Sequence, residues 1–224
     1  MKPILAILNI FIDPAESVRN MEGRFAWVWP FLLACMAGIG VSLVVAPAMM
    51  QLMRTNPPAN IPPATLEKMA EYSGKMQNLV FVTQPLTLGC MFALTALLLF
   101  AACSVLDVKA KFMQLFTLVA HAGLVLSLAQ IAAGVVIKMK GELQSLKELQ
   151  PSFGPDMFLP EGSSGVLIGF LKCLDLFHLW YYVVLVLAIA AMFKLTKGKA
   201  LGVALPIIFL MFVFTMVSSM FSNR

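Results

Sequence analysis

The sequence predicts an all-α polytopic membrane protein, with five transmembrane helices in one bundle and an amphipathic helix at the membrane interface before them. Hydrophobic residues make up 60% of the 224 residues and charged residues only 12%, whereas soluble domains average about 25% charged residues. The apolar residues gather in runs of about twenty or more, the length that a helix needs to cross about 30 Å of hydrocarbon. Proline and glycine clusters separate these runs.

The first 25 residues are expected at the cytosolic face of the membrane. Lys2 precedes an apolar run over 3–12, which is short for a span and within the range of a cleaved signal peptide. Asp13, Pro14 and Glu16 follow this run in place of a small-x-small cleavage site. A retained helix lying on the bilayer is therefore favoured, and a cleaved signal segment stays open as the alternative.

A single transmembrane domain is predicted over 26–221. Trp27 and Trp29 stand at the opening of its first span, as is typical of the aromatic belt at a membrane interface. Two proline pairs, at 57–58 and 62–63, forbid a continuous helix after that span. The seven residues before the last span permit only an antiparallel hairpin. The predicted spans are about 26–50, 78–103, 112–137, 166–193 and 201–221.

The placement of basic residues predicts the orientation. Five lysines crowd two very short connectors, 104–111 and 194–200, while the basic residues of the other loops are spread over longer segments that also carry acids. Lysine and arginine in short loops are typical of the cytoplasmic side. We therefore expect a multi-pass protein of the cell membrane, with the N-terminus in the cytoplasm and the C-terminus outside.

Several function classes are disfavoured by the residues present. The net charge of +5 does not indicate a nucleic-acid binder, because the basic residues flank apolar runs, where they contact lipid headgroups. Neither a phosphate-binding glycine loop nor a GxSxG nucleophile setting occurs. No cofactor or metal is expected. Four cysteines inside or at the ends of apolar runs are interpreted as packing residues: Cys35, Cys90, Cys103 and Cys173.

The candidate polar site lies on the fourth and third predicted spans. Lys172, Asp175 and His178 stand three residues apart along one helical stripe that drifts by about 60° per step, and His121 lies on the third span. An ion pair between Lys172 and Asp175 and a hydrogen bond between Asp175 and His178 are expected. At a rise of about 1.5 Å per residue, Asp175 lies about 7 Å and His178 about 3 Å from the middle of the fourth span. We therefore expect that the two histidines can approach each other if both face the interior of the bundle.

Two interpretations of this stripe stay open. Ionisable groups at membrane depth usually face the bundle interior and often mark function, which predicts a proton relay or a polar ligand site. The favoured interpretation is a polar clamp that fixes the fourth span against its neighbours, with Lys172 reaching the interface. His121 alone is interpreted as a packed, hydrogen-bonded histidine. Two histidines and an aspartate can bind iron or zinc, but the metal-ligand spacings that would indicate this are missing.

Three segments, at 174–180, 194–200 and 11–14, resemble motifs of a known family of multispanning membrane proteins, the Yip1 domain family. The run 174–180, LDLFHLW, is similar to that family's entry to a span, and the run 194–200, KLTKGKA, is similar to its short basic turn before the last span. The run 11–14, FIDP, is similar to the segment ahead of its first span. The residues that carry the resemblance are Asp13, Pro14, Asp175, Phe177, Trp180, Lys197, Gly198 and Lys199.

The resemblance implies a compact five-helix bundle with its N-terminus inside. Eukaryotic members of the family sit in early secretory membranes and associate with Rab-type GTPases and with one another. This chain has only about 25 residues before the first span, which argues against GTPase binding and favours a bacterial inner-membrane member. Family members often place a tyrosine and a proline near the positions of His121 and Val125, so this chain departs from them on the third span.

Three hypotheses of function follow. The leading one is a binding protein, an adaptor or organiser of membrane proteins or lipids, whose partners are the bilayer, other membrane proteins or a second copy of itself. The alternative is a small transporter, channel or lipid translocator that uses Asp175 and His178. An intramembrane enzyme is the least favoured, so a catalytic role is not expected.

Overall fold

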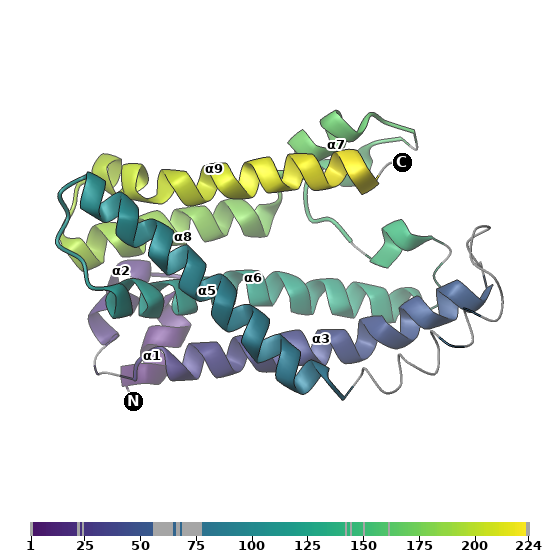
Figure 1. The fold of residues 1–224 in the computed structure, drawn as a ribbon, viewed down its shortest axis with the longest axis horizontal. Helices are drawn as coiled ribbons and strands as arrows, with labels where there is room; N and C mark the ends of the chain where they lie inside the picture. The colour runs from purple at the N-terminus through teal and green to yellow at the C-terminus, as the bar shows by residue number, and fades with distance from the viewer. Residues whose placement is uncertain are drawn as a thin grey trace. The chain divides into compact units, whose positions relative to one another are not determined.

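The computed structural model describes residues 2–21, 23, 25–55, 65, 68, 78–141, 143, 145–149, 151–160 and 162–222. This part of the chain contains eight α-helices, two short 3-10 helices and no strand (Figure 1). Five of these helices are long and apolar enough to cross a membrane, so the prediction of an all-helical polytopic membrane protein is confirmed. The proline pairs at 57–58 and 62–63 lie outside the described residues.

The five long helices overlap the five predicted spans. The first, α3, runs through Pro47 and ends five residues beyond the predicted limit of 50, and α9 begins four residues before the predicted start at 201. The bounds of the five helices are α3 Val28–Thr55, α5 Val80–Val105, α6 Phe112–Lys140, α8 Leu176–Phe193 and α9 Lys197–Ser222.

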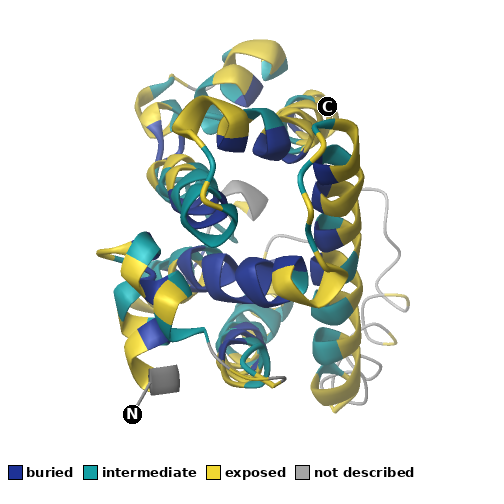
Figure 2. Ribbon diagram, turned by 90° about the vertical axis from the view of Figure 1, so that its left-hand side faces the viewer, coloured by how far each residue is buried: buried dark blue, intermediate teal, exposed yellow. Residues whose placement is uncertain are grey.

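The chain divides into two compact units. The first comprises Met1–Leu33, Gly89–Leu126 and Ser152–Arg224. Its core is the first half of α6, where the helix is buried on nearly all sides, as the dark blue stretch in Figure 2 shows. Neighbouring α5 packs on this core closely enough that a Cβ on Gly123 would lie 2.7 Å from the Phe92 ring.

The second unit comprises Ala34–Leu88 and Ser127–Pro151. Leu52 of α3 and Ile137 of α6 form its small core together with Leu143. An ion pair with a 3.2 Å distance between Lys140 Nζ and a Glu148 oxygen joins the end of α6 to the 3-10 helix Leu146–Leu149.

The N-terminal segment forms two short helices, so the prediction of a single interfacial helix over 1–25 is corrected. Helix α1, Lys2–Asn9, and helix α2, Pro14–Asn20, are separated by a turn that ends at Asp13. Asp13 caps α2 by accepting a hydrogen bond from Glu16 N at 3.0 Å, and Pro14 fits the first helical position because it has no N–H to lose. The Ser17 hydroxyl donates to the Ala6 carbonyl at 2.6 Å and ties the two helices together.

The fourth predicted span is also interrupted. In place of one helix over 166–193, the structure has α7, Gly165–Lys172, then a break, then α8, Leu176–Phe193. The helix restarts because the Asp175 carboxylate takes up free N–H groups in the first turn of α8. With 18 residues, α8 is about 27 Å long. Asp175 and Lys172 therefore lie beyond the end of the candidate span and not near its middle.

Helix α7 packs against the far end of α9 through two glycines (Figure 1). A Cβ on Gly165 would lie 3.0 Å from the Ser219 carbonyl oxygen, and one on Gly169 would lie 3.1 Å from Met216 Cα. Two small residues four apart allow helices to approach this closely inside membranes. The C-terminal half of α9 thus has α7 as its neighbour, and its N-terminal half packs with α8.

The turn between α8 and α9 has three residues and forms the expected antiparallel hairpin. Lys194 adopts the left-handed conformation with φ 52° and closes α8, and the Thr196 hydroxyl accepts a hydrogen bond from Lys199 N at 3.3 Å. A Cβ on Gly202 would lie 3.3 Å from Leu106. The connectors α5–α6 and α8–α9 therefore lie at the same end of the first unit.

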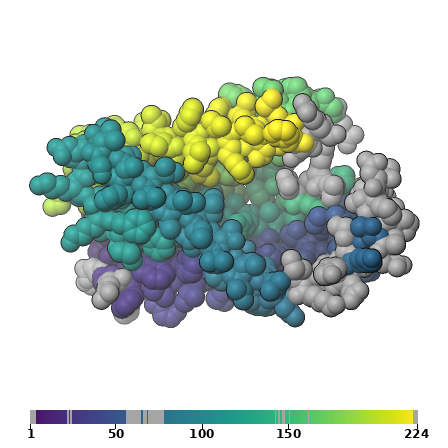
Figure 3. Space-filling view, in the orientation of Figure 1, coloured from purple at the N-terminus to yellow at the C-terminus, as the bar shows by residue number. Residues whose placement is uncertain are grey.

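Large apolar side chains cover the outside of the long helices. On α9, Leu201, Leu205 and Phe209 recur every four residues and are 47%, 55% and 65% exposed, and Figure 3 shows the α9 side chains, in yellow, at the molecular surface. A water-soluble protein does not expose apolar stripes of this length. The apolar helices indicate a lipid bilayer as their solvent.

Candidate functional site

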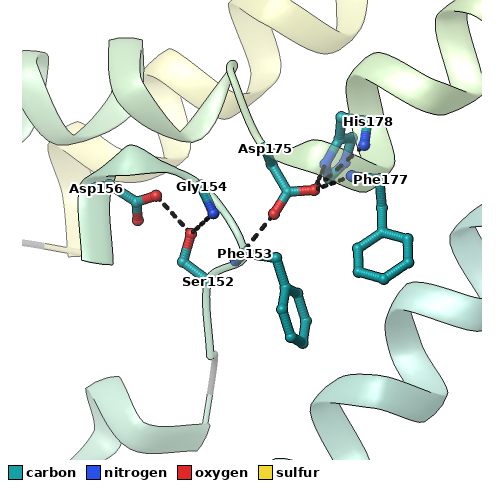
Figure 4. A network of polar contacts seen from close by, with 7 residues as sticks. All are labelled: Ser152, Phe153, Gly154, Asp156, Asp175, Phe177 and His178. Carbon is teal, nitrogen blue, oxygen red and sulfur yellow. Dashed lines mark hydrogen bonds and ion pairs between the residues drawn. The ribbon is translucent and has the colours of Figure 1, made fainter. Parts of the chain in front are cut away.

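The Asp175 carboxylate is the centre of a polar network at the start of α8 (Figure 4). Its Oδ1 accepts hydrogen bonds from Phe177 N at 2.9 Å and His178 N at 3.2 Å. The predicted bond to the His178 ring is present, since Nδ1 lies 3.2 Å from the same oxygen. Its Oδ2 accepts a fourth bond from Phe153 N at 3.0 Å. One carboxylate thus caps a helix and holds a loop that stands 22 residues earlier.

The loop contributes further contacts to this network. Leu176 N donates to the Phe153 carbonyl at 3.4 Å, and the Phe153 and Phe177 rings pack edge to face with centroids 5.2 Å apart. The Ser152 hydroxyl donates to the Asp156 carboxylate and accepts from Gly154 N at 3.2 Å (Figure 4). The loop and α8 are therefore joined by backbone, carboxylate and aromatic contacts together.

Gly154 permits the loop to approach this closely. A Cβ at that position would lie 3.2 Å from Asp175 Cα and 2.9 Å from an Asp156 carboxylate oxygen. The first of these neighbours is backbone and cannot rotate away. A side chain at residue 154 would therefore push the loop off the start of α8.

The environment of Asp175 favours its charged form. Burial alone raises the pKa of the carboxyl. His178 opposes this effect through hydrogen bonds from its ring and its backbone and through its charge, and the hydrogen bond from Phe153 adds to it. Together these contacts hold the pKa of Asp175 below its ordinary value. Hydrogen bonds donated to a carboxylate stabilise the ionised form. Asp175 is 8% exposed and lies outside the candidate span Leu176–Phe193, so it is kept as an anion by the protein.

Lys172 does not take part as predicted. Among the ion pairs of the described residues, none joins Lys172 to Asp175. The prediction assumed one continuous helix with both side chains on one stripe, and the break between α7 and α8 removes that geometry. The contact that remains is along the backbone, where Asp175 N donates to the Lys172 carbonyl at 3.1 Å.

His121 lies apart from the Asp175 network. It is 1% exposed inside α6, and its Nδ1 donates to the Thr117 carbonyl of the same helix at 2.8 Å. None of the hydrogen bonds given for the described residues connects it to His178, Asp175 or Lys172. The described part of the chain contains no cluster of three histidine, cysteine, aspartate or glutamate residues suited to a metal ion.

A second contact joins the N-terminal segment to the start of α8. The Phe11 and Trp180 rings meet edge to face with centroids 5.8 Å apart, next to the turn in which Asp13 caps α2. Segments from opposite ends of the sequence thus meet at one place. All these residues belong to the first unit.

A match to the model of a protein family shows which family the chain belongs to. The model of the Yip1 domain matches residues 8–218. The chain belongs to the Yip1 domain family. Neither a curated protein nor a solved structure matches the chain.

Seven of the eight residues that carry the Yip1 resemblance stand at helix starts, and the eighth, Trp180, lies in the second turn of α8. Asp13 and Pro14 begin α2, and Asp175 caps α8 with Phe177 in its first turn. Lys197, Gly198 and Lys199 form the first turn of α9. In this Yip1 protein, Asp13 and Asp175 therefore set where α2 and α8 begin, and Asp175 also holds the loop at Phe153 against α8.

Several residues of the site were not predicted from the sequence. Phe153 and Gly154 lie in a polar loop whose pairing partner is 22 residues away, and no local pattern indicates that partner. Two local signals were present. Ser164 is a standard capping residue, and its hydroxyl accepts from Leu167 N at 3.3 Å. Gly165 and Gly169 are spaced for close helix packing.

Proposed function

We propose that this Yip1 protein acts by binding, as an adaptor or organiser of membrane proteins or lipids, and not by transport or catalysis. The observation that carries the proposal is the use of the Asp175 carboxylate. All four of its hydrogen bonds hold parts of the chain together. A proton relay or an ion site needs polar groups with bonding capacity left for a cargo.

The separation of the candidate residues supports the same proposal. A relay across the membrane requires a chain of polar groups, but His121 bonds within its own helix and Lys172 makes no ion pair with Asp175. Among the described residues, no buried side-chain nitrogen or oxygen lacks a hydrogen-bond partner. The buried polar groups are therefore engaged within the chain, and the outward apolar faces remain for lipids and partner proteins.

The membrane in which the protein resides and its orientation there are also part of the proposal. We place the protein in a bacterial inner membrane with its N-terminus in the cytoplasm. The five lysines of the two short connectors support this orientation, and these connectors lie at one end of the first unit. The partners are other membrane proteins, lipids or a second copy of the chain.

Reconstitution into liposomes tests the proposal against transport. Purified protein should move neither protons, potassium ions nor fluorescent lipids faster than protein-free vesicles do. The Asp175→Asn variant should differ from the parent in thermal stability alone. Flux in the parent that disappears in a folded Asp175→Asn variant would establish the transporter hypothesis instead.

Site-specific photocrosslinking in native membranes tests the binding role itself. A crosslinking residue at the exposed Phe209 or Val183 positions reports on an outward face, and one at the buried Leu118 position serves as the matched control. An organiser should give a discrete protein or lipid adduct from one outward face and none from Leu118. Equal, diffuse lipid labelling from both outward faces would contradict a specific partner.

A further inference from the structure

A pocket of about 550 Å³ lies in the first unit, near the two short connectors. Its wall is built from the end of α2, the segment before α3, the start of α6 and the end of α8. The lining residues are Val18, Met21, Gly23, Phe25, Trp27, Met113, Gln114, Thr117 and Met192. This volume is within the roughly 300–1,000 Å³ of small-molecule sites, so the pocket is large enough for a ligand.

The pocket wall is mostly apolar, and it is adaptable. Three of its residues are methionines, whose unbranched side chains fit irregular apolar partners. Two of its polar groups bond to nearby backbone: the Thr117 hydroxyl donates to the Met113 carbonyl at 2.8 Å, and the Gln114 amide oxygen accepts from Lys111 N, just before α6, at 3.1 Å. The wall therefore favours a flexible hydrocarbon chain over a polar solute.

The pocket also has an inner and an outer side. Thr117 is 8% exposed, whereas Met113, one helical turn earlier, is 47% exposed. The two residues therefore mark a buried floor and an open rim. A chain entering over the rim would leave its polar end outside, close to the connectors.

Among the described residues, basic residues stand near the lining residues in sequence in three of the four surrounding segments. Arg19 follows Val18, Lys111 comes two residues before Met113, and Lys194 comes two residues after Met192; all three are exposed. Across α2 with its cap and the segments 104–111 and 194–200, the second of which includes the first turn of α9, there are six basic residues against three acids, a net charge of +3. The basic residues are Arg19, Lys109, Lys111, Lys194, Lys197 and Lys199, and the acids are Asp13, Glu16 and Asp107.

We propose that this pocket holds one acyl chain of an anionic membrane lipid, with the lipid headgroup among Arg19, Lys111 and Lys194. The inference rests on the proposed binding role and names its ligand class. A free anion would contact the basic residues and leave the apolar pocket empty. A neutral lipid would fill the pocket and leave the basic residues without a negative partner. Basic residues next to a span attract anionic headgroups, and only an anionic lipid satisfies both parts of the site.

Quenching of Trp27 fluorescence tests this site, because Trp27 lines the pocket. A variant with Trp29→Phe and Trp180→Phe leaves Trp27 as the single tryptophan. In phosphatidylcholine nanodiscs, phosphatidylglycerol with brominated chains should half-quench Trp27 at a mole fraction at least fivefold lower than phosphatidylcholine with the same chains. If the double variant does not fold, the difference between the parent and Trp27→Phe gives the same signal.

Charge-matched variants separate a specific site from general attraction. Replacing Arg19, Lys111 and Lys194 by glutamine should abolish the preference for the anionic probe. Replacing Arg54, Lys138 and Lys172 by glutamine removes the same charge elsewhere and should leave the preference unchanged. Equal quenching by both probes in the parent, or an equal loss in both triple variants, overturns the lipid site.

A competition arm distinguishes a lipid from a free anion. Millimolar inorganic phosphate should not relieve the quenching, and relief would assign the charges to a soluble anion instead. These outcomes are separate from the liposome flux assay. Failure of the lipid site leaves the binding role standing, whereas flux through the protein would remove the binding role.

Discussion

At the scale of single residues, the Asp175 side chain holds two segments of the chain together, whereas the sequence pattern predicted a polar stripe formed jointly by Lys172, Asp175 and His178. It is the cap of α8 and the anchor of the loop at Phe153. Its four donors come from the backbone of two segments and from one imidazole. The anchoring role of Asp175 is therefore visible in its hydrogen bonds in the structure, and the residues next to it in the sequence do not indicate it.

The Asp175→Asn variant should be less stable than the parent. The amide group has one oxygen, so its NH₂ must face either Phe153 N or the N–H groups of Phe177 and His178. Placing a donor against a donor leaves a buried group unpaired, which costs about 1–3 kcal/mol. Thermal unfolding in detergent should show a lower midpoint. Asp107→Asn, at an exposed left-handed turn, is the matched control and should leave the midpoint unchanged.

The stability of the protein should fall in acid because of the same residue. The folded state lowers the pKa of Asp175, while the unfolded chain has a value of about 3.9. The stabilisation is therefore complete above about pH 4 and is lost as the pH falls through the lower, folded pKa. Unfolding midpoints measured from pH 6 to pH 2 should drop more for the parent than for Asp175→Asn. Parallel curves would contradict this assignment.

At the scale of helices, apolar run length predicted the long helices well. The four predicted spans other than the fourth match α3, α5, α6 and α9 to within a few residues, because hydropathy over twenty residues is a strong signal. The fourth was predicted as continuous, since the run from α7 into α8 contains few polar residues. The break depends on a partner 22 residues away, and a local pattern does not contain that information.

The same reasoning explains which site residues were found. The hydrogen bond between Asp175 and His178 was predictable because i, i+3 residues meet on a helix, and it survives because His178 lies in the first turn of α8. The ion pair with Lys172 required a helix on both sides of Asp175. Contacts with Phe153 and between Phe11 and Trp180 depend on tertiary packing alone.

The glycines of α7 should be sensitive to added side chains. Gly165→Ala and Gly169→Ala would place a Cβ about 3 Å from backbone atoms of α9, and overpacking of this kind typically costs about 1–3 kcal/mol. Gly198→Ala on α9 is the control, because nothing lies within 4 Å of its added Cβ. The first two variants should unfold at a lower temperature than the parent. Equal midpoints for all three would show that α7 can move away from α9 at little cost.

At the scale of the whole molecule, the proposed membrane topology depends on α6. Its 29 residues make it about 43 Å long, which is long enough for the helix to cross a bilayer, and the proposed topology assigns the connector before it and the segment after it to opposite sides. The lysines of the short connectors then favour the cytoplasm as the side on which the connectors lie.

Cysteine labelling should confirm this topology. In a background without the four native cysteines, Lys109→Cys should react with a membrane-impermeant maleimide only after the cells are opened. Met157→Cys, at a residue that is 62% exposed beyond the end of α6, should react in intact cells. The reverse pattern would invert the orientation, and labelling of both in intact cells would contradict the crossing by α6.

The brevity of the turn between α8 and α9 has a consequence for biosynthesis. Three residues span about 11 Å when extended, far less than the roughly 30 Å of hydrocarbon, so the two helices cannot enter the bilayer one after the other from opposite faces. They must instead insert as one antiparallel hairpin, with both ends of the turn at the same face of the bilayer. The trailing stretch of α9 after Lys199 carries no acid or base up to Ser222, so no charge in it resists that passage.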